Sequence, residues 1–192
     1  SAPAQAGQDE PWVFPFSRPL PPGTGDNQAA AYNTGDNTTM YDVAFALVWA
    51  TGDEVDNVNA AYAYASCSNC VTVAVAFQVV LIMDDAHVVV PQNLAVAANY
   101  DCYKCITAAV ASQLVLSVEH APGDEQLLAL ASVWNRLLTF GQSITSSSLD
   151  QISTQLQVFK EEITAILAAA PAVSPSSSAT VAPVGSSAAP VG

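Results

Sequence analysis

Basic residues are scarce in this chain, which has 4 Lys and Arg against 17 Asp and Glu and only 2 His. The formal net charge of −13 repels nucleic-acid phosphates and anionic lipid headgroups, so neither is an expected partner. No uninterrupted apolar run reaches the roughly 18 residues that a membrane-spanning helix needs. We therefore expect no nucleic-acid partner and no membrane span.

The sequence also lacks the motifs of the common enzyme classes. It contains no HExxH, no Gly-rich phosphate loop and no GxSxG. Its histidines are His87 and His120, and the pair Glu119-His120 stands just before Pro122, where a surface turn is expected rather than a catalytic dyad. We therefore expect that the protein is not an enzyme and assign no catalytic residue.

Two ends of biased composition flank the more regular part of the chain. Residues 1–26 are rich in Pro, Gly and Gln, and residues 171–192 are uncharged and rich in Ala, Ser and Pro. The opening Ser-Ala-Pro-Ala is typical of a chain cut by signal peptidase. These features predict a secreted, extracellular or cell-surface protein with an extended N-terminal arm and a C-terminal linker, disordered tail or O-glycosylated stalk.

The N-terminal arm contains one apolar island. Prolines at five positions within residues 11–22 exclude a helix or a central strand there. The arm either lies over its own domain or docks on a neighbouring subunit. The residues that would dock are Trp12, Val13, Phe14 and Phe16.

A repeated unit with strand periodicity fills the middle of the chain. Residues 59–81 alternate small and bulky side chains on both sides of a CxxC pair, which predicts a β-hairpin with the cysteines at its tip. A shift of 35 residues superposes Cys102 and Cys105 on Cys67 and Cys70, and a shift of 32 in the other direction reveals a copy without cysteines. We expect three hairpins, over residues 27–50, 59–83 and 93–118.

The periodicity changes to that of a helix after Pro122. Apolar residues recur three and four apart over 127–137 and again over 149–166, with Ser148 and Gln151 as a capping box. The predicted fold class is α+β, an antiparallel sheet of three repeated β-hairpins plus a C-terminal antiparallel helical hairpin. The expected divisions are an arm (1–26), a three-hairpin β domain (27–121), a helical hairpin (122–170) and a tail (171–192).

The four cysteines allow three interpretations. A two-residue turn brings its flanking Cα atoms within about 7 Å, so disulfides within each CxxC pair are the favoured reading in a secreted chain. A four-cysteine zinc site and thioredoxin-type redox chemistry are the alternatives. The usual haem attachment is excluded because Val71 and Ile106 stand where CxxCH needs histidine. The predicted disulfide residues are Cys67, Cys70, Cys102 and Cys105, with no cofactor.

An acidic turn between the first two hairpins offers a candidate calcium site. Asp53, Asp56 and Asn57 could supply oxygen ligands, although Asp and Asn are also ordinary turn residues. The segment lacks the loop order of an EF-hand.

The third repeat follows the pattern NxAxAxNxxCxxCxTxAxAxQxVL, and the second repeat matches it closely. This pattern resembles hairpin-repeat segments of secreted actinobacterial proteins, some of them described in connection with peptide zinc metalloproteases. The resemblance covers about residues 27–118 and implies no functional residues, since the chain has no zinc-protease motif. The matching residues are Asn93, Ala95, Ala97, Asn99, Cys102, Cys105, Thr107, Ala109, Ala111, Gln113, Val115 and Leu116.

Two classes of function remain. The first is a secreted structural protein, a subunit of an extracellular homopolymer or filament at the cell surface or in a biofilm matrix, held by exchange of arm or tail between subunits. The second is an extracellular binding module that presents its CxxC tips to a metal ion or a partner protein. The first accounts for the apolar arm, the small-residue faces and the low content of Lys and Arg.

Overall fold

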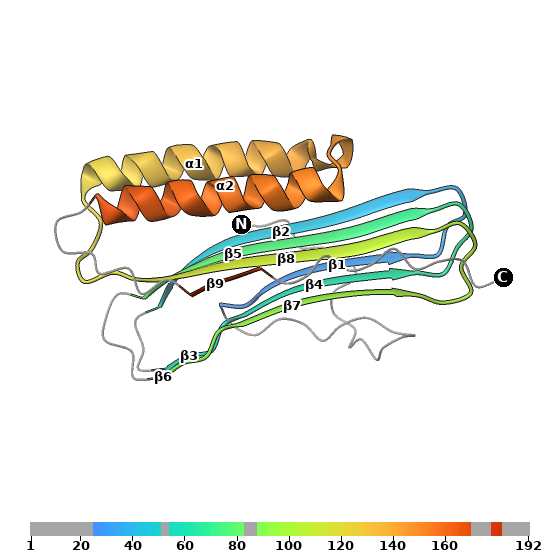
Figure 1. Ribbon diagram of the computed structural model, residues 1–192, viewed down its shortest axis with the longest axis horizontal. Helices are drawn as coiled ribbons and strands as arrows, with labels where there is room; N and C mark the ends of the chain where they lie inside the picture. The colour runs from blue at the N-terminus through green and yellow to red at the C-terminus, as the bar shows by residue number, and fades with distance from the viewer. Residues whose placement is uncertain (1–24, 51–53, 83–87, 170–177, 182–192) are drawn as a thin grey trace.

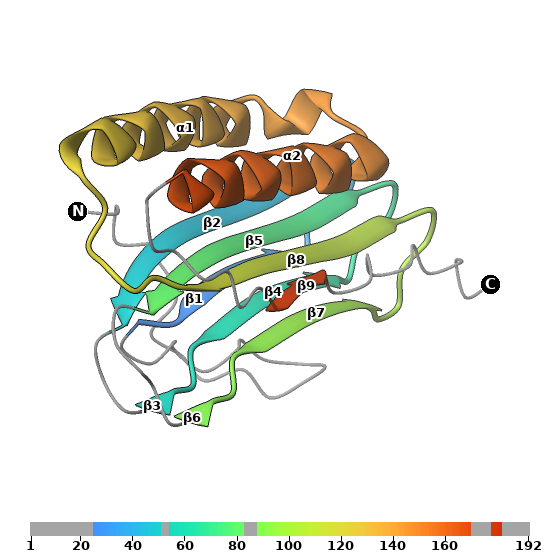
Figure 2. The same ribbon diagram turned by 60° about the vertical axis from the view of Figure 1, so that its left-hand side comes forward.

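The computed structural model describes residues 25–50, 54–82, 88–169 and 178–181. These residues form three layers, in which two β-sheets lie face to face and a pair of helices covers the outer face of one sheet (Figures 1 and 2). Among these ranges no helix is long and apolar enough to cross a membrane.

Each of the two large sheets takes one strand from every repeat. The first sheet, sheet A, has the order β1-β4-β7, and the second, sheet B, has the order β2-β5-β8-β9. A third, small sheet pairs β3 (Glu54–Val55) with β6 (Val88–Val89). The longer strands are β1 (Asn27–Asn33), β4 (Val58–Ala65), β7 (Gln92–Asn99), β2 (Thr39–Ala50), β5 (Val71–Ile82), β8 (Ile106–Ser117) and β9 (Ser178–Val181).

The predicted antiparallel hairpins are wrong. The strands on either side of each tip belong to different sheets, and every repeat stacks on the next in parallel. Equivalent residues are direct neighbours, so that Asn27 lies beside Asn59 and Asn59 beside Asn93. Among the strands that the structure describes, only β9 runs antiparallel to its neighbour. We call each strand–tip–strand unit a rung: rung 1 is β1 and β2, rung 2 is β4 and β5, and rung 3 is β7 and β8.

Alanine side chains explain why the two strands of a rung face each other instead of pairing. The inner faces of the sheets meet in a buried cluster made almost entirely of alanine, which lets the backbones approach closely. The strand alternation of small and bulky residues is the same in a hairpin and in this arrangement, so periodicity could not separate them. The fully buried members are Ala29, Ala31, Ala61, Ala63, Ala74, Ala76, Ala109 and Ala111.

The tips are too long for a two-residue hairpin turn. Each contains a residue with positive φ at the same place in the repeat, namely Asn37 (58°), Asn69 (51°) and Lys104 (52°). Asn tolerates this left-handed conformation better than most residues. Rung 1 keeps the bend without cysteines, so the bend itself does not depend on them.

The helical layer follows the sequence prediction more closely. Helix α1 (Asp124–Gln142) and helix α2 (Leu149–Ala168) are joined by a short 3-10 turn, η1 (Ile144–Ser146), and the capping box of Ser148 and Gln151 is confirmed. The helices bury the bulky face of sheet B, including Phe77 and Leu81. Gly141 lies inside α1, where a Cβ would come 2.7 Å from Phe45 Cε2. Glycine there permits close approach of α1 to β2.

Candidate functional site

The two CxxC tips lie side by side at one end of the stack. Their sulfur atoms pair as Cys67–Cys70 and Cys102–Cys105, with Cα atoms 6.1 and 6.0 Å apart. All four sulfurs lie within 4.8 Å of one another and are buried with Ala65. The parallel stacking of rungs 2 and 3 brings the pairs together.

Backbone hydrogen bonds hold these tips in register. The N–H of Asn69 donates to the carbonyl of Tyr103 (2.8 Å), and the N–H of Tyr103 donates to the carbonyl of Cys67 (3.2 Å). At the neighbouring tip of rung 1, Asp36 accepts from the N–H of Ser68 (2.7 Å). The cluster is therefore positioned by the stack and not only by its sulfur atoms.

The polar groups around the sulfurs suit a disulfide better than a metal thiolate. The carbonyl oxygen of Cys67 is 2.8 Å from Cys105 Sγ, and that of Asn33 is 3.5 Å from Cys67 Sγ. A thiolate that binds zinc is negatively charged and is repelled by carbonyl oxygens, whereas a neutral disulfide tolerates them. Four sulfurs at this spacing could hold zinc only after reduction of both pairs and some shift of these carbonyls.

We predict that non-reducing peptide mapping will recover Cys67 linked to Cys70 and Cys102 linked to Cys105. Each closes a very short loop, so its loss is expected to cost on the order of 2 kcal/mol of stability. Mass spectrometry of the dialysed native protein should find no bound zinc. One zinc ion per chain with four free thiols would contradict this prediction.

The structure describes only two of the three candidate calcium ligands. Asp56 is exposed, Asn57 is buried with its Nδ2 donating to the carbonyl of Gly25 (2.8 Å), and Asp53 lies outside the described residues. In the described part of the chain, the four cysteines are the one group of at least three potential metal ligands. The arm residues Trp12, Val13, Phe14 and Phe16 also lie outside the described residues.

A ladder of asparagines, buried at Asn27 and Asn59 and half-buried at Asn93, runs through the stack and was not singled out as a site from the sequence. Asn27 Nδ2 donates to Asn59 Oδ1 (2.9 Å), and Asn59 Nδ2 donates to Asn93 Oδ1 (2.8 Å). Each amide also donates to a carbonyl of its own rung, at Ala44, Ala76 and Ala111. The ladder has a direction, because both hydrogen bonds between its side chains donate from rung 1 towards rung 3.

Other identical side chains also stack between neighbouring rungs. Gln113 Nε2 donates to Gln78 Oε1 (2.8 Å) between rungs 3 and 2. The rings of Tyr32 and Tyr64 stack with centroids 4.9 Å apart and an interplanar angle of 6°. Such ladders are typical of assemblies in which equal strands repeat in register.

The strands at the ends of the stack are sheet edges. In sheet A the edges are β1 and β7, and in sheet B they are β2 and the short β9. Strand β9 pairs with β8 only from Ser112 to Val115, so on the side away from β5 most of the length of β8 has no neighbouring strand within the described ranges. Edge strands present N–H and C=O groups that can pair with another chain.

Asp42 modifies the edge at rung 1. It occupies the position taken by Ala74 in rung 2 and by Ala109 in rung 3. Its Oδ2 accepts from the N–H of Ala30 on β1 at 2.5 Å. Burial raises the pKa of Asp42, and the hydrogen bond from Ala30 opposes part of that rise. A charge directed at an edge strand is a known means of limiting edge-to-edge association.

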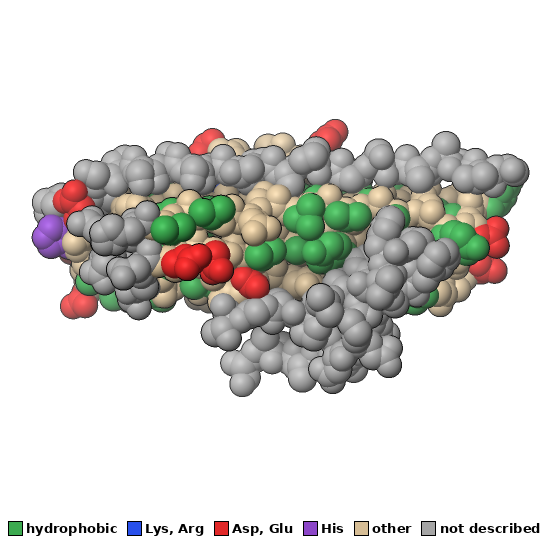
Figure 3. All heavy atoms as spheres, turned by 90° about the horizontal axis from the view of Figure 1, so that it is seen from below, with side chains coloured by type: hydrophobic (Ala, Val, Ile, Leu, Met, Phe, Trp, Pro, Cys, Tyr) green, Lys and Arg blue, Asp and Glu red, His purple; other side chains and the backbone are tan. Residues whose placement is uncertain are grey.

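The outer face of sheet A is apolar and acidic. Figure 3, which views the molecule from below, shows hydrophobic side chains along the middle of this face and Asp and Glu around them, with no Lys or Arg among the described atoms in view. Leu94 on β7 is 43% exposed here. The described side chains of this face therefore offer no basic group that could bind phosphate.

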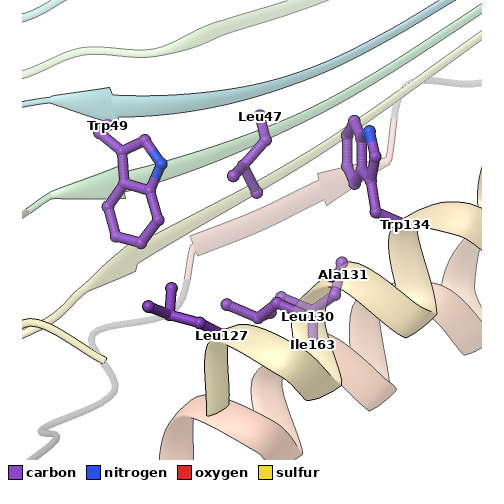
Figure 4. Close-up of a pocket in the computed structure, with 7 residues that line it drawn as sticks. All are labelled: Leu47, Trp49, Leu127, Leu130, Ala131, Trp134 and Ile163. Atoms are coloured by element: carbon purple, nitrogen blue, oxygen red, sulfur yellow. The ribbon is translucent and has the colours of Figure 1, made fainter. Parts of the chain in front are cut away.

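A groove of about 250 Å³ lies between sheet B and the helices. In Figure 4 Trp49 and Leu47 extend from β2 towards α1, and Trp134 rises from α1 towards the sheet. Trp49 is 38% exposed and Leu127 is 43% exposed, so the groove is open to solvent. Its principal lining residues are Leu47, Trp49, Leu127, Leu130, Trp134 and Ile163.

No protein-family model, no curated protein and no solved structure matches this chain. The resemblance to secreted CxxC repeat proteins therefore stays a prediction.

Proposed function

We propose that this protein is a structural subunit of an extracellular homopolymer in which copies stack rung on rung. The observation that carries the proposal is the polar asparagine ladder, which ends at edge strands on both sides of the stack. Rung 3 of one copy and rung 1 of the next are complementary, because Asn93 of the first would face Asn27 of the second in the direction in which the ladder already runs.

Such a contact is heterologous, so it leaves an unused rung at each end. Unless the rotation between copies closes a ring, addition continues and produces a filament. Each added copy would repeat the rung spacing of about 4.8 Å three times and so advance the filament by about 14 Å. The low content of Lys and Arg and the exposed apolar side chains suit a surface that meets other copies.

The tail takes part in this proposal through β9. Strand β9 occupies Ser112–Val115 of the β8 edge, which is the edge that β2 of the next copy would use. Full stacking therefore requires β9 to leave its own β8, and the released tail can then pair with a neighbour. Tail exchange in this proposal means that β9 leaves the β8 edge of its own copy and pairs with a neighbouring copy.

Sedimentation velocity over a range of protein concentrations, followed by negative-stain imaging, tests the function. The proposal expects multimers that grow with concentration and elongated particles of constant width. A chain that remains monomeric at high concentration under oxidising conditions, from neutral to mildly acidic pH, would refute it.

We predict that assembly strengthens as pH falls through the raised pKa of Asp42. Stacking on rung 1 buries this side chain further, and burial penalises the carboxylate but not the neutral acid. The pKa of Asp42 is higher in the folded chain than in the unfolded chain, so the folded chain binds the proton more tightly. The favourable contribution of Asp42 to stability is therefore present at low pH and lost as pH rises. Asp42→Asn should assemble at neutral pH and lose this part of the pH dependence.

The matched control is Asp150→Asn, which removes one charge from an exposed position at the start of α2. It separates the effect at the edge from the effect of a smaller net charge. Equal assembly of the two variants at neutral pH would show that Asp42 does not act as an edge charge.

A further inference from the structure

We propose that the groove between β2 and the helices is the receptor for the Trp12–Phe16 segment of a neighbouring copy. This inference rests on the proposed homopolymer and names the contact that joins its subunits. The groove and the segment have matching chemistry, since one is lined by leucine and tryptophan and the other carries one tryptophan and two phenylalanines. Such aromatic side chains contribute strongly to interfaces.

The start of the described chain lies close to the groove. A Cβ built on Gly25 would be 3.8 Å from Val48 Cγ1, and Val48 stands between Leu47 and Trp49 of the groove. Phe16 lies nine positions before Gly25, and this length of chain spans at most about 30 Å when extended. The segment is therefore within reach of its own groove and of the groove of a copy displaced by about 14 Å.

In the proposed polymer, the arm that fills each groove comes from the neighbouring copy. Val48 faces the space between the sheets, whereas Leu47 and Trp49 face the helices, so a same-chain arm would pass around the β2 edge. In the proposed polymer that edge is covered by the adjacent copy. The arm then lies on the adjacent copy instead.

Charges flanking the two apolar surfaces also match. Arg18 follows the segment by two residues and is one of 4 basic residues in the chain. Asp124 and Glu125 are exposed in the first turn of α1, one turn before Leu127 of the groove. Docking that brings Arg18 to this turn adds an attraction that salt weakens.

The first experiment measures binding of a fluorescent peptide with the sequence of residues 8–22 by anisotropy. The receptor is the full chain with Trp12, Phe14 and Phe16 replaced by serine, so that its own arm does not compete. Leu127→Asp in this receptor should weaken binding at least tenfold, because it places a charge in the apolar groove. Leu128→Asp is the matched control: Leu128 is 73% exposed and does not line the groove, so a change of less than twofold is expected. Circular dichroism verifies that both variants fold.

The second experiment mixes two full-length chains and follows their association by sedimentation. One carries the arm substitutions and the other carries Leu127→Asp, so each alone lacks one half of the contact. We expect each alone to assemble poorly and the mixture to form complexes of the two, since the intact arm of the second chain fills the intact groove of the first.

The possible outcomes distinguish failure of the groove assignment from failure of the proposed homopolymer. Peptide binding that is insensitive to Leu127→Asp overturns the groove assignment, even if the native protein forms filaments. Groove-dependent peptide binding without association of the mixed chains overturns the neighbour as donor and assigns the groove to the arm of the same chain. Groove-dependent binding by a native protein that never assembles refutes the homopolymer and leaves the groove as an intramolecular site.

Discussion

Replacing Asn59 by alanine is expected to lower the free energy of unfolding by about 3 kcal/mol or more. Asn59 is fully buried in the middle of the ladder, where its Nδ2 donates to Asn93 Oδ1 and to the carbonyls of Ala76 and Ser112. Alanine would leave these acceptors, and the Nδ2 of Asn27, with one partner fewer inside the stack. Unpaired buried polar groups cost more than an ordinary hydrogen bond contributes.

Urea denaturation measures this loss. Asn135→Ala is the control, because Asn135 is exposed on α1 and its replacement should change stability by no more than about 0.5 kcal/mol. The loss for Asn59→Ala should also exceed that for Asn93→Ala, since Asn93 lies in an end rung. Equal, small effects at Asn59 and Asn135 would show that the ladder does not hold the rungs together.

Replacing Lys160 by methionine is expected to raise stability by about 1 to 3 kcal/mol, which corresponds to a few degrees in Tm for a chain of this size. Lys160 is 1% exposed in α2, and its Nζ has no hydrogen-bond partner within the described structure. Burial lowers the pKa of Lys160 because the ammonium form is poorly solvated there. Methionine fills similar space without this cost.

The pH dependence gives a second readout. Because the folded-state pKa of Lys160 lies below the unfolded value of 10.5, the unfolded chain binds the proton more tightly. Below the folded-state pKa this lysine destabilises the fold, and the penalty disappears as pH rises towards 10.5. Thermal melts at several pH values should show the largest gain for Lys160→Met at neutral pH and a shrinking gain at alkaline pH. Lys104→Met, at an exposed tip position, should show no comparable gain.

The sequence located the strands well but could not determine their partners. The expected ranges 27–50, 59–83 and 93–118 each cover, to within one residue, the two long strands of one rung. A hairpin and a stacked rung share the same alternation of alanine and bulky residues, so periodicity alone could not distinguish them. The informative signal was the repeat itself, since equal residues at shifts of 32 and 35 are what parallel stacking places side by side.

The functional features were visible to different degrees. Asn27, Asn59 and Asn93 occur at equal places in the repeat, and Asp42 departs from the alanine of the other rungs, so both could have been found once stacking was assumed. The groove depends on how α1 packs against β2, which no local pattern specifies. The burial of Lys160 was equally hidden, because a lysine beside an apolar stripe usually extends to solvent.

Cysteine crosslinking between copies tests the stacked homopolymer most directly. Ala30 on β1 aligns with Tyr62 on β4 and through it with Val96 on β7, so stacking would place Val96 of one copy beside Ala30 of the next. The double variant Ala30→Cys with Val96→Cys should give a ladder of covalent multimers on mild oxidation, resolved by non-reducing electrophoresis. Tyr32→Cys with Leu94→Cys is displaced by four residues, or about 13 Å, which exceeds the reach of a disulfide. Multimers from the first pair alone are the result that the stacked homopolymer predicts. Monomers from both pairs, or equal multimers from both, would contradict it.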